Sequence, residues 1–116
     1  LSNIIRIDTS GEIDTRLNDG SIDVILLYDV FWYFPLRDRR LTALLDELHR
    51  VSKPDAFLSV FPKHIDSKRL KEKIEGHGFT FTNTLSGNML HDNRLEKGEI
   101  YNFKTKNAHT ETERAP

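Results

Sequence analysis

The chain has 116 residues, of which 37% are hydrophobic and 30% charged, so length and composition predict one folded domain rather than a disordered chain. Its formal net charge of -1 gives no electrostatic reason to bind nucleic acid or an anionic membrane, and the lack of cysteine excludes disulfides, thiolate zinc sites and a cysteine nucleophile. No apolar run approaches the roughly 20 residues that span a bilayer, and no signal-peptide pattern is present. We therefore expect a cytoplasmic protein with neither nucleic-acid nor membrane partners.

The N-terminal residues 4–8 are the first strand candidate, and a Thr-Ser-Gly sequence ends it. A natural domain usually begins with a looser lead-in than a strand within three residues of its start. This pattern predicts that the chain is a piece of a longer protein.

Residues 22–29 are an apolar run that follows the turn sequence Asp19-Gly20-Ser21. A short apolar run bounded by turns is typical of a strand buried on both faces of a parallel sheet. Open α/β sheets bind ligands just past the carboxyl ends of such strands. Function is therefore expected first at Tyr28, Asp29 and the aromatic residues 31–34.

Residues 38–52 form the clearest helix, with apolar side chains at helical spacing on one face. Asp38 can cap its start, and Lys53-Pro54 stops it. Residues 57–61 are a second buried strand. A strand, a helix and a strand in this order predict a βαβ unit with parallel strands.

The rest of the chain contains a loop at 62–66, a short helix that ends at Glu75, and a strand at 79–85 with two-residue alternation. Residues 86–97 are polar and predict an irregular connection. Residues 98–104 form the last strand, which returns as a hairpin. Residues 107–116 lack apolar periodicity and predict a flexible tail after a domain at 1–106.

Three features of the sequence are candidate sites. Asp29 could orient a ligand or act as a base, or it could merely cap a turn. His64 follows the second buried strand and could be a base or a ligand, or a surface loop residue. The four consecutive aromatics at 31–34 could line a substrate site, cover the local core or face a partner. His91-Asp92 resembles half a metal site, but no second histidine has ligand spacing, so no metal is expected.

Two stretches together resemble class I S-adenosylmethionine-dependent methyltransferases. Residues 19–25 resemble the turn into the family's fourth strand. Residues 44–58 resemble the passage "helix, Arg-Val-Leu-Lys-Pro-Gly-Gly, strand" before its fifth strand, with Ser52 in place of the leucine and Asp55-Ala56 in place of the glycines. The resemblance implies the C-terminal portion of the fold: an α/β, partial Rossmann-like sheet, mostly parallel with an antiparallel C-terminal hairpin.

The resemblance also implies a cofactor, S-adenosylmethionine, and an unknown small-molecule or protein methyl acceptor. It assigns residues 4–8 to the family's third strand. The residues implied to bind the cofactor are Asp8, Thr9 and Ser10 at the adenine, and Tyr28, Asp29 and Val30 near the sulfonium. The residues implied on the acceptor side are Trp32 and Tyr33 as substrate contacts, and His64, which with Asp29 is the catalytic candidate.

The family's first strand, its Gly-rich loop and the acid that ends its second strand have no counterpart in this sequence. The cofactor site is therefore incomplete in this chain, and we expect weak cofactor binding or none. Residues 22–28 should then be an exposed edge strand that pairs with another copy, giving a homo-oligomer. Three interpretations stay open: part of a methyltransferase, a non-catalytic α/β association module that uses its open sheet edge, and a different α/β enzyme with the same strand rhythm.

Overall fold

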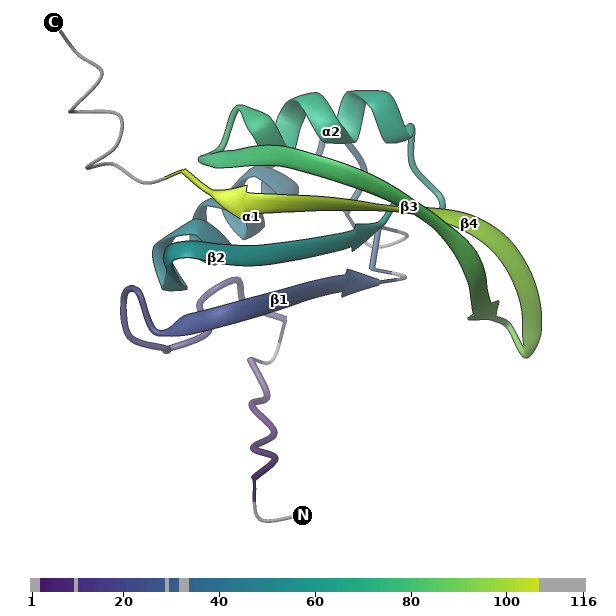
Figure 1. Cartoon of the computed structure of the whole chain (residues 1–116). Coiled ribbons are helices and arrows are strands. Elements are labelled where there is room, and N and C mark those ends of the chain that lie inside the picture. The colour runs from purple at the N-terminus through teal and green to yellow at the C-terminus, as the bar shows by residue number, and fades with distance from the viewer. Residues whose placement is uncertain (1–2, 10, 29, 32–33, 107–116) are drawn as a thin grey trace, which may run out of the picture.

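The computed structural model describes residues 3–9, 11–28, 30–31 and 34–106. In those residues the chain folds into strands and helices in the following order (Figure 1): β1 (Ile22–Tyr28), α1 (Arg39–Val51), β2 (Ser52–Phe61), α2 (Ser67–Glu75), β3 (Phe79–His91) and β4 (Arg94–Thr105). Neither helix is long and apolar enough to cross a membrane.

The strands of the described residues form one sheet in the order β1-β2-β4-β3. β1 and β2 are parallel, whereas β4 is antiparallel to both β2 and β3. The predicted α/β fold with an antiparallel C-terminal hairpin is thus confirmed. The sheet is mixed, and parallel pairing is less extensive than expected because residues 4–8 form no strand.

The helix α1 forms where the sequence predicts it. The Asp38 carboxylate accepts a hydrogen bond from the Arg40 backbone N–H at 2.8 Å, which satisfies a free donor of the first turn. Four residues on one face are buried: Leu41, Leu45, Leu48 and Val51. β2 begins immediately after α1, several residues before the predicted strand, and it includes Pro54 and the left-handed Asp55 (φ 61°).

Both helices cover the same face of the sheet, and the core lies between them and the strands. Alternate residues of each strand point to this face. The strand residues of the buried cluster are Ile25, Leu27, Leu58, Val60, Phe79 and Phe103, and α2 adds Leu70 and Ile74. Asp66 caps α2, since its carboxylate accepts from the Arg69 N–H at 3.1 Å.

The prediction that residues 22–29 are buried on both faces is wrong. Val24 and Leu26 are 56% and 62% exposed. They point away from the helices, and no layer of the described residues covers that face. β1 also lies at the edge of the sheet, as the incomplete fold led us to expect.

Residues 86–97, predicted to be irregular, form the outer part of a long hairpin. β3 and β4 stay paired from Phe79↔Thr105 to His91↔Arg94. The turn consists of Asp92 and Asn93 with φ of 51° and 62°, as a two-residue type I′ turn requires. The sequence did not predict these strands because both faces of this part of the hairpin are solvated, and its residues therefore show no apolar alternation.

The N-terminal segment does not form the predicted strand. Residues 4–8 are irregular and exposed. The predicted tail at 107–116 lies outside the described residues.

Candidate functional site

The carboxyl ends of β1 and β2 lie side by side, because the strands are parallel and their last residues, Tyr28 and Phe61, are paired. The Tyr28 hydroxyl is 2.8 Å from the Ser59 Oγ. The rings of Tyr28 and Phe61 meet edge to face, with centroids 6.4 Å apart. These contacts hold Tyr28 against β2, on the sheet face that the helices leave open.

The residues after β1 turn back into the core. Phe31 is buried, with 1% of its surface exposed, and Val30 is half-buried against the same cluster. Phe34 is half-buried as well, with the Arg40 guanidinium 5.7 Å above its ring. Part of the aromatic run therefore covers the local core. Asp29, Trp32 and Tyr33 lie outside the described residues.

The loop after β2 bends at once and reaches the hairpin. The Lys63 N–H donates to the Phe61 carbonyl at 2.9 Å, and His64 is exposed with a left-handed φ of 68°. The Lys63 Nζ lies 2.8 Å from Glu96 Oε2 of β4. The structure thus places His64 near Tyr28, at the carboxyl ends of β1 and β2. The Lys63–Glu96 ion pair connects the loop that carries His64 to the hairpin.

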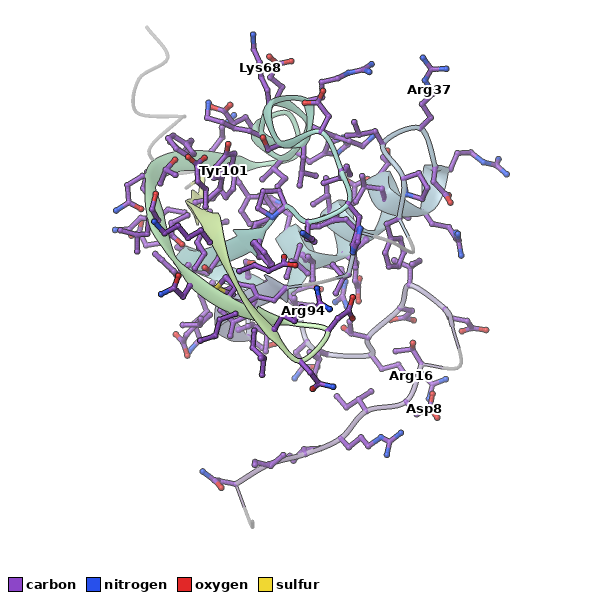
Figure 2. The ribbon with its side chains drawn as sticks, turned by 90° about the vertical axis from the view of Figure 1, so that its right-hand side faces the viewer. Asp8, Arg16, Arg37, Lys68, Arg94 and Tyr101 are labelled. Atoms are coloured by element: carbon purple, nitrogen blue, oxygen red, sulfur yellow. The ribbon has the colours of Figure 1, made fainter. Side chains whose placement is uncertain are left out.

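Asp8 and Thr9 belong to the irregular N-terminal segment. Figure 2 shows Asp8 on this segment, outside the layer of strands and helices, and its side chain is exposed. The Thr9 carbonyl accepts from the Glu12 N–H at 3.0 Å, which makes a local turn. Ser10 lies outside the described residues. The strand end that was expected to present Asp8 is not formed, so the role of these residues at an adenine stays a prediction.

A family model described as "Methyltransferase domain" matches residues 3–60, half of the chain and the part that holds β1, α1 and nearly all of β2. This chain belongs to that family. The resemblance to class I S-adenosylmethionine-dependent methyltransferases is confirmed. A comparison with curated proteins gives no match.

Solved structures share the fold of this methyltransferase domain at low sequence identity. A S-adenosylmethionine-dependent methyltransferase from Methanosarcina mazei superposes with a TM-score of 0.68 at 11% identity, over 87% of this chain and 66% of that one. The [4+2]-cyclase SpnF gives 0.57 at 12%, over 81% and 53%. An N-methyltransferase from Bradyrhizobium japonicum, in complex with S-adenosyl-L-homocysteine, gives 0.51 at 12%, over 79% and 50%. This chain spans less than two thirds of each, and likeness at this identity shows the fold alone.

The strand-to-helix connections bear on how a cofactor could bind to this methyltransferase domain. A backbone that approaches a ligand closely at a strand-to-helix turn normally uses glycine. The connection from β1 to α1 and that from β2 to α2 contain no glycine. Among the described residues, no group of three or more His, Asp or Glu side chains could hold a metal ion.

The structure adds residues that the sequence did not single out. Ser59 positions Tyr28, and Glu96 anchors the loop that carries His64. Glu96 is 33 residues from Lys63 and fell in the segment predicted to be irregular. Asp92 and Asn93 are residue types that tolerate the left-handed conformation of a hairpin turn, and they were the signal that could have placed Glu96 on a strand.

At the opposite, amino end of the parallel pair, the pKa of a described carboxylate, that of Glu47, is strongly shifted. Arg50 donates two hydrogen bonds to Glu47, at 2.7 and 2.8 Å, and Thr15 adds a backbone and a hydroxyl donor. The Arg50 guanidinium, opposed by partial burial, lowers the pKa of Glu47 to about 2. Arg50 also meets Asp19 at 2.6 Å. This cluster fastens the segment before β1 onto α1 and has a structural role.

Proposed function

We propose that this chain is the acceptor-side part of an S-adenosylmethionine-dependent methyltransferase. One observation carries the proposal: the part of the chain that matches the family contains β1 and most of β2, whose carboxyl ends lie together. Open α/β sheets bind their ligands at this kind of edge. The presence of a cyclase among the structures with this fold is the reason that the reaction has to be tested.

The chain's own residues would serve positioning more than chemistry. Methyl transfer is a displacement that depends mainly on holding the acceptor in line with the methyl group. Tyr28 and Val30 are proposed to border the methyl donor, and Trp32 and Tyr33 the acceptor. A base, Asp29 or His64, would contribute only where the acceptor has a proton to lose. The acceptor would be a small molecule or a protein.

We expect the chain alone to bind the cofactor weakly or not at all. The strand-to-helix connections lack glycine, and the N-terminal segment does not present Asp8 at a strand end. The cofactor supplies an electrophilic methyl group when it is bound. Neither strand-to-helix connection has a glycine that could give it the contacts of a glycine-rich loop.

The test is calorimetric titration of the chain with S-adenosylhomocysteine, repeated with Asp8→Ala and Tyr28→Phe. Glu12→Ala is the matched control, since Glu12 is also exposed on the N-terminal segment. We expect weak binding or none. Any binding should be weakened by Tyr28→Phe and Asp8→Ala and left unchanged by Glu12→Ala, because only hydrogen bonds at the site should matter. Binding that none of the site variants affects would contradict the proposed site.

The second candidate function is association without catalysis. It is favoured by the edge position of β1 and by the exposure of Val24 and Leu26 on it. An uncapped apolar edge strand pairs readily with another chain. Sedimentation equilibrium distinguishes the two: an inert chain that associates through β1 supports the module, and a monomer that binds the cofactor analogue supports the enzyme.

A further inference from the structure

The outer half of the β3–β4 hairpin extends beyond the rest of the sheet (Figure 1). β2 pairs with β4 only between Val60↔Tyr101 and Phe57↔Lys104. The outer rungs, from Ser86↔Glu99 to His91↔Arg94, join the two hairpin strands to each other alone. We call residues 86–99 the flap. A two-stranded ribbon of this kind has little stability of its own, so its position depends on a few contacts with the body.

Near the base of the flap, Gly87 of β3 is paired with Gly98 of β4, so this cross-strand pair has no side chains. We call it the glycine rung. Gly98 has a steric reason: a Cβ there would lie 2.5 Å from Cε1 of Phe61. Gly87 has none, since a Cβ would meet nothing within 4 Å and its φ is not in the left-handed region. Glycine inside a strand leaves the backbone more conformational freedom than alanine would. The paired glycines make this rung the most pliable point of the hairpin.

Two contacts between described residues connect the end of β2 to the flap. The Phe61 ring packs against the Gly98 backbone. Beyond it, the Lys63 ammonium pairs with the Glu96 carboxylate at 2.8 Å, with 33% and 34% of the two side chains exposed. The ion pair lies outside the glycine rung, so it is placed to restrain rotation about it.

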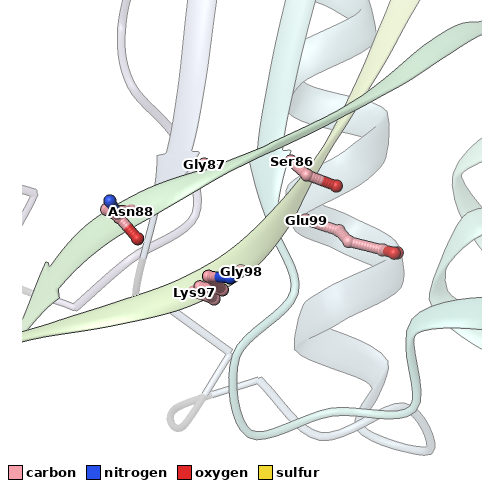
Figure 3. A pocket seen from close by; sticks show the side chains of 6 residues that line it. All are labelled: Ser86, Gly87, Asn88, Lys97, Gly98 and Glu99. Carbon is pink, nitrogen blue, oxygen red and sulfur yellow. The ribbon is translucent and has the colours of Figure 1, made fainter.

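The flap also has space to move. A hollow of about 430 Å³ lies at the glycine rung. Its lining residues, shown in Figure 3, are Ser86, Gly87, Asn88, Lys97, Gly98 and Glu99. Leu90 and Leu95 pair across the ladder on the same face as Asn88 and Lys97, and they are 71% and 76% exposed. Bending toward the hollow would remove part of this apolar surface from water. The position seen in the structure leaves it exposed and keeps the ion pair.

We propose that the flap is a hinged element that rotates about the Gly87–Gly98 rung and is latched by the Lys63–Glu96 ion pair. Lys63 belongs to the loop that carries His64, at the edge where β1 and β2 end. The flap therefore sets the width of the acceptor side, a role that rests on the proposed function. The hinge and the latch themselves do not depend on it.

Spin labels measure the movement in the full chain, which has no cysteine of its own. The label sites are Arg94→Cys on the flap and Ala43→Cys on α1, both exposed. In the chain that carries only these two substitutions, we expect one dominant distance between the labels. Lys63→Gln should raise the population at a second distance about two- to fivefold, the effect of losing a partly exposed ion pair. Reversing the pair with Lys63→Glu and Glu96→Lys together should restore the first distance.

The matched control is Lys53→Gln, which removes a surface ion pair with Asp23 at 3.2 Å, away from the flap. The proposal is overturned if Lys63→Gln leaves the distance distribution unchanged, or if Lys53→Gln alters it equally. Gly87→Ala, added to Lys63→Gln, should narrow the distribution again because it stiffens the rung. If Lys63→Gln does not fold, Glu96→Gln breaks the same pair without a change of volume. These distances need no cofactor, so their outcome is separate from that of the calorimetric titration.

Discussion

Glu47 illustrates how single residues stabilise this fold. Its carboxylate, 11% exposed, accepts hydrogen bonds from Arg50 and from Thr15, which is 32 residues away. We expect Glu47→Gln to lower the free energy of unfolding by about 1–2 kcal/mol at pH 7, because charge-assisted hydrogen bonds are replaced by neutral ones. Urea denaturation measures the change.

The same residue gives the stability a pH dependence of known sign. The pKa of Glu47 falls from 4.5 to about 2 on folding. A lowered pKa stabilises the fold above the unfolded value and loses that contribution as pH falls through the folded value. The difference between the wild type and Glu47→Gln should therefore shrink as pH falls from about 4.5 toward 2. Glu12→Gln, on the exposed N-terminal segment, should change the stability by about 0.5 kcal/mol or less at either pH, and an equal effect there would refute the assignment.

At the scale of the elements, the glycine rung of the hairpin offers a matched pair of substitutions. Gly98→Ala puts a methyl group 2.5 Å from a ring atom of the buried Phe61, so the ring or the strand must shift. Overpacking of this kind costs about 1–3 kcal/mol. Thermal unfolding should show a lowered midpoint for Gly98→Ala. Gly87→Ala, on the same rung but with open space, should leave the midpoint unchanged or slightly higher, and equal losses in both variants would show that the contact with Phe61 is unimportant.

The whole molecule has an open side, formed by the free edge of β1 and the sheet face that carries Val24 and Leu26. If copies associate there, Leu26→Lys should raise the dissociation constant at least about tenfold, or 1.4 kcal/mol, because an edge lysine opposes strand pairing. Sedimentation equilibrium measures this. Leu90→Lys is the control, since Leu90 is equally apolar and 71% exposed but lies on the flap. A chain that is monomeric at all concentrations would rule out association through β1.

Sequence reasoning predicted the elements whose apolar residues repeat. The spacing of Leu41, Leu45 and Leu48 gave α1 and its Asp38 cap, and the apolar run at 57–61 gave the inner part of β2. Because each of these elements buries one defined face, the spacing of its apolar residues can be recognised in the sequence. The parallel pairing of β1 and β2 followed from their order.

Features that depend on distant neighbours could not be predicted in this way. The run at 22–28 has the composition of a fully buried strand, and only the position of the helices shows that Leu26 faces solvent. The ion pair of Lys63 and Glu96 joins residues 33 apart, one in the loop after β2 and one in the solvated outer part of the hairpin. The sequence placed Tyr28 and His64 at the carboxyl ends of β1 and β2, where the structure has them, and their functional roles stay predictions. Asp29, Trp32 and Tyr33 lie outside the described residues.

The long hairpin also bears on the order in which the chain folds. Its strands are neighbours in sequence and are joined by a tight turn, so its pairing has a low loop-closure cost and hairpins form in roughly 1–10 μs. The parallel pair closes a loop of about thirty residues, from Ile22 to Ser52, before any contact rewards it. Once the hairpin has formed, only the connection from Phe61 to Phe79 separates β2 from it, so we expect β2 to pair with β4 first and β1 to dock last. The strand with the free edge is then also the one that stays unpaired longest during folding, when contact between chains most readily leads to aggregation.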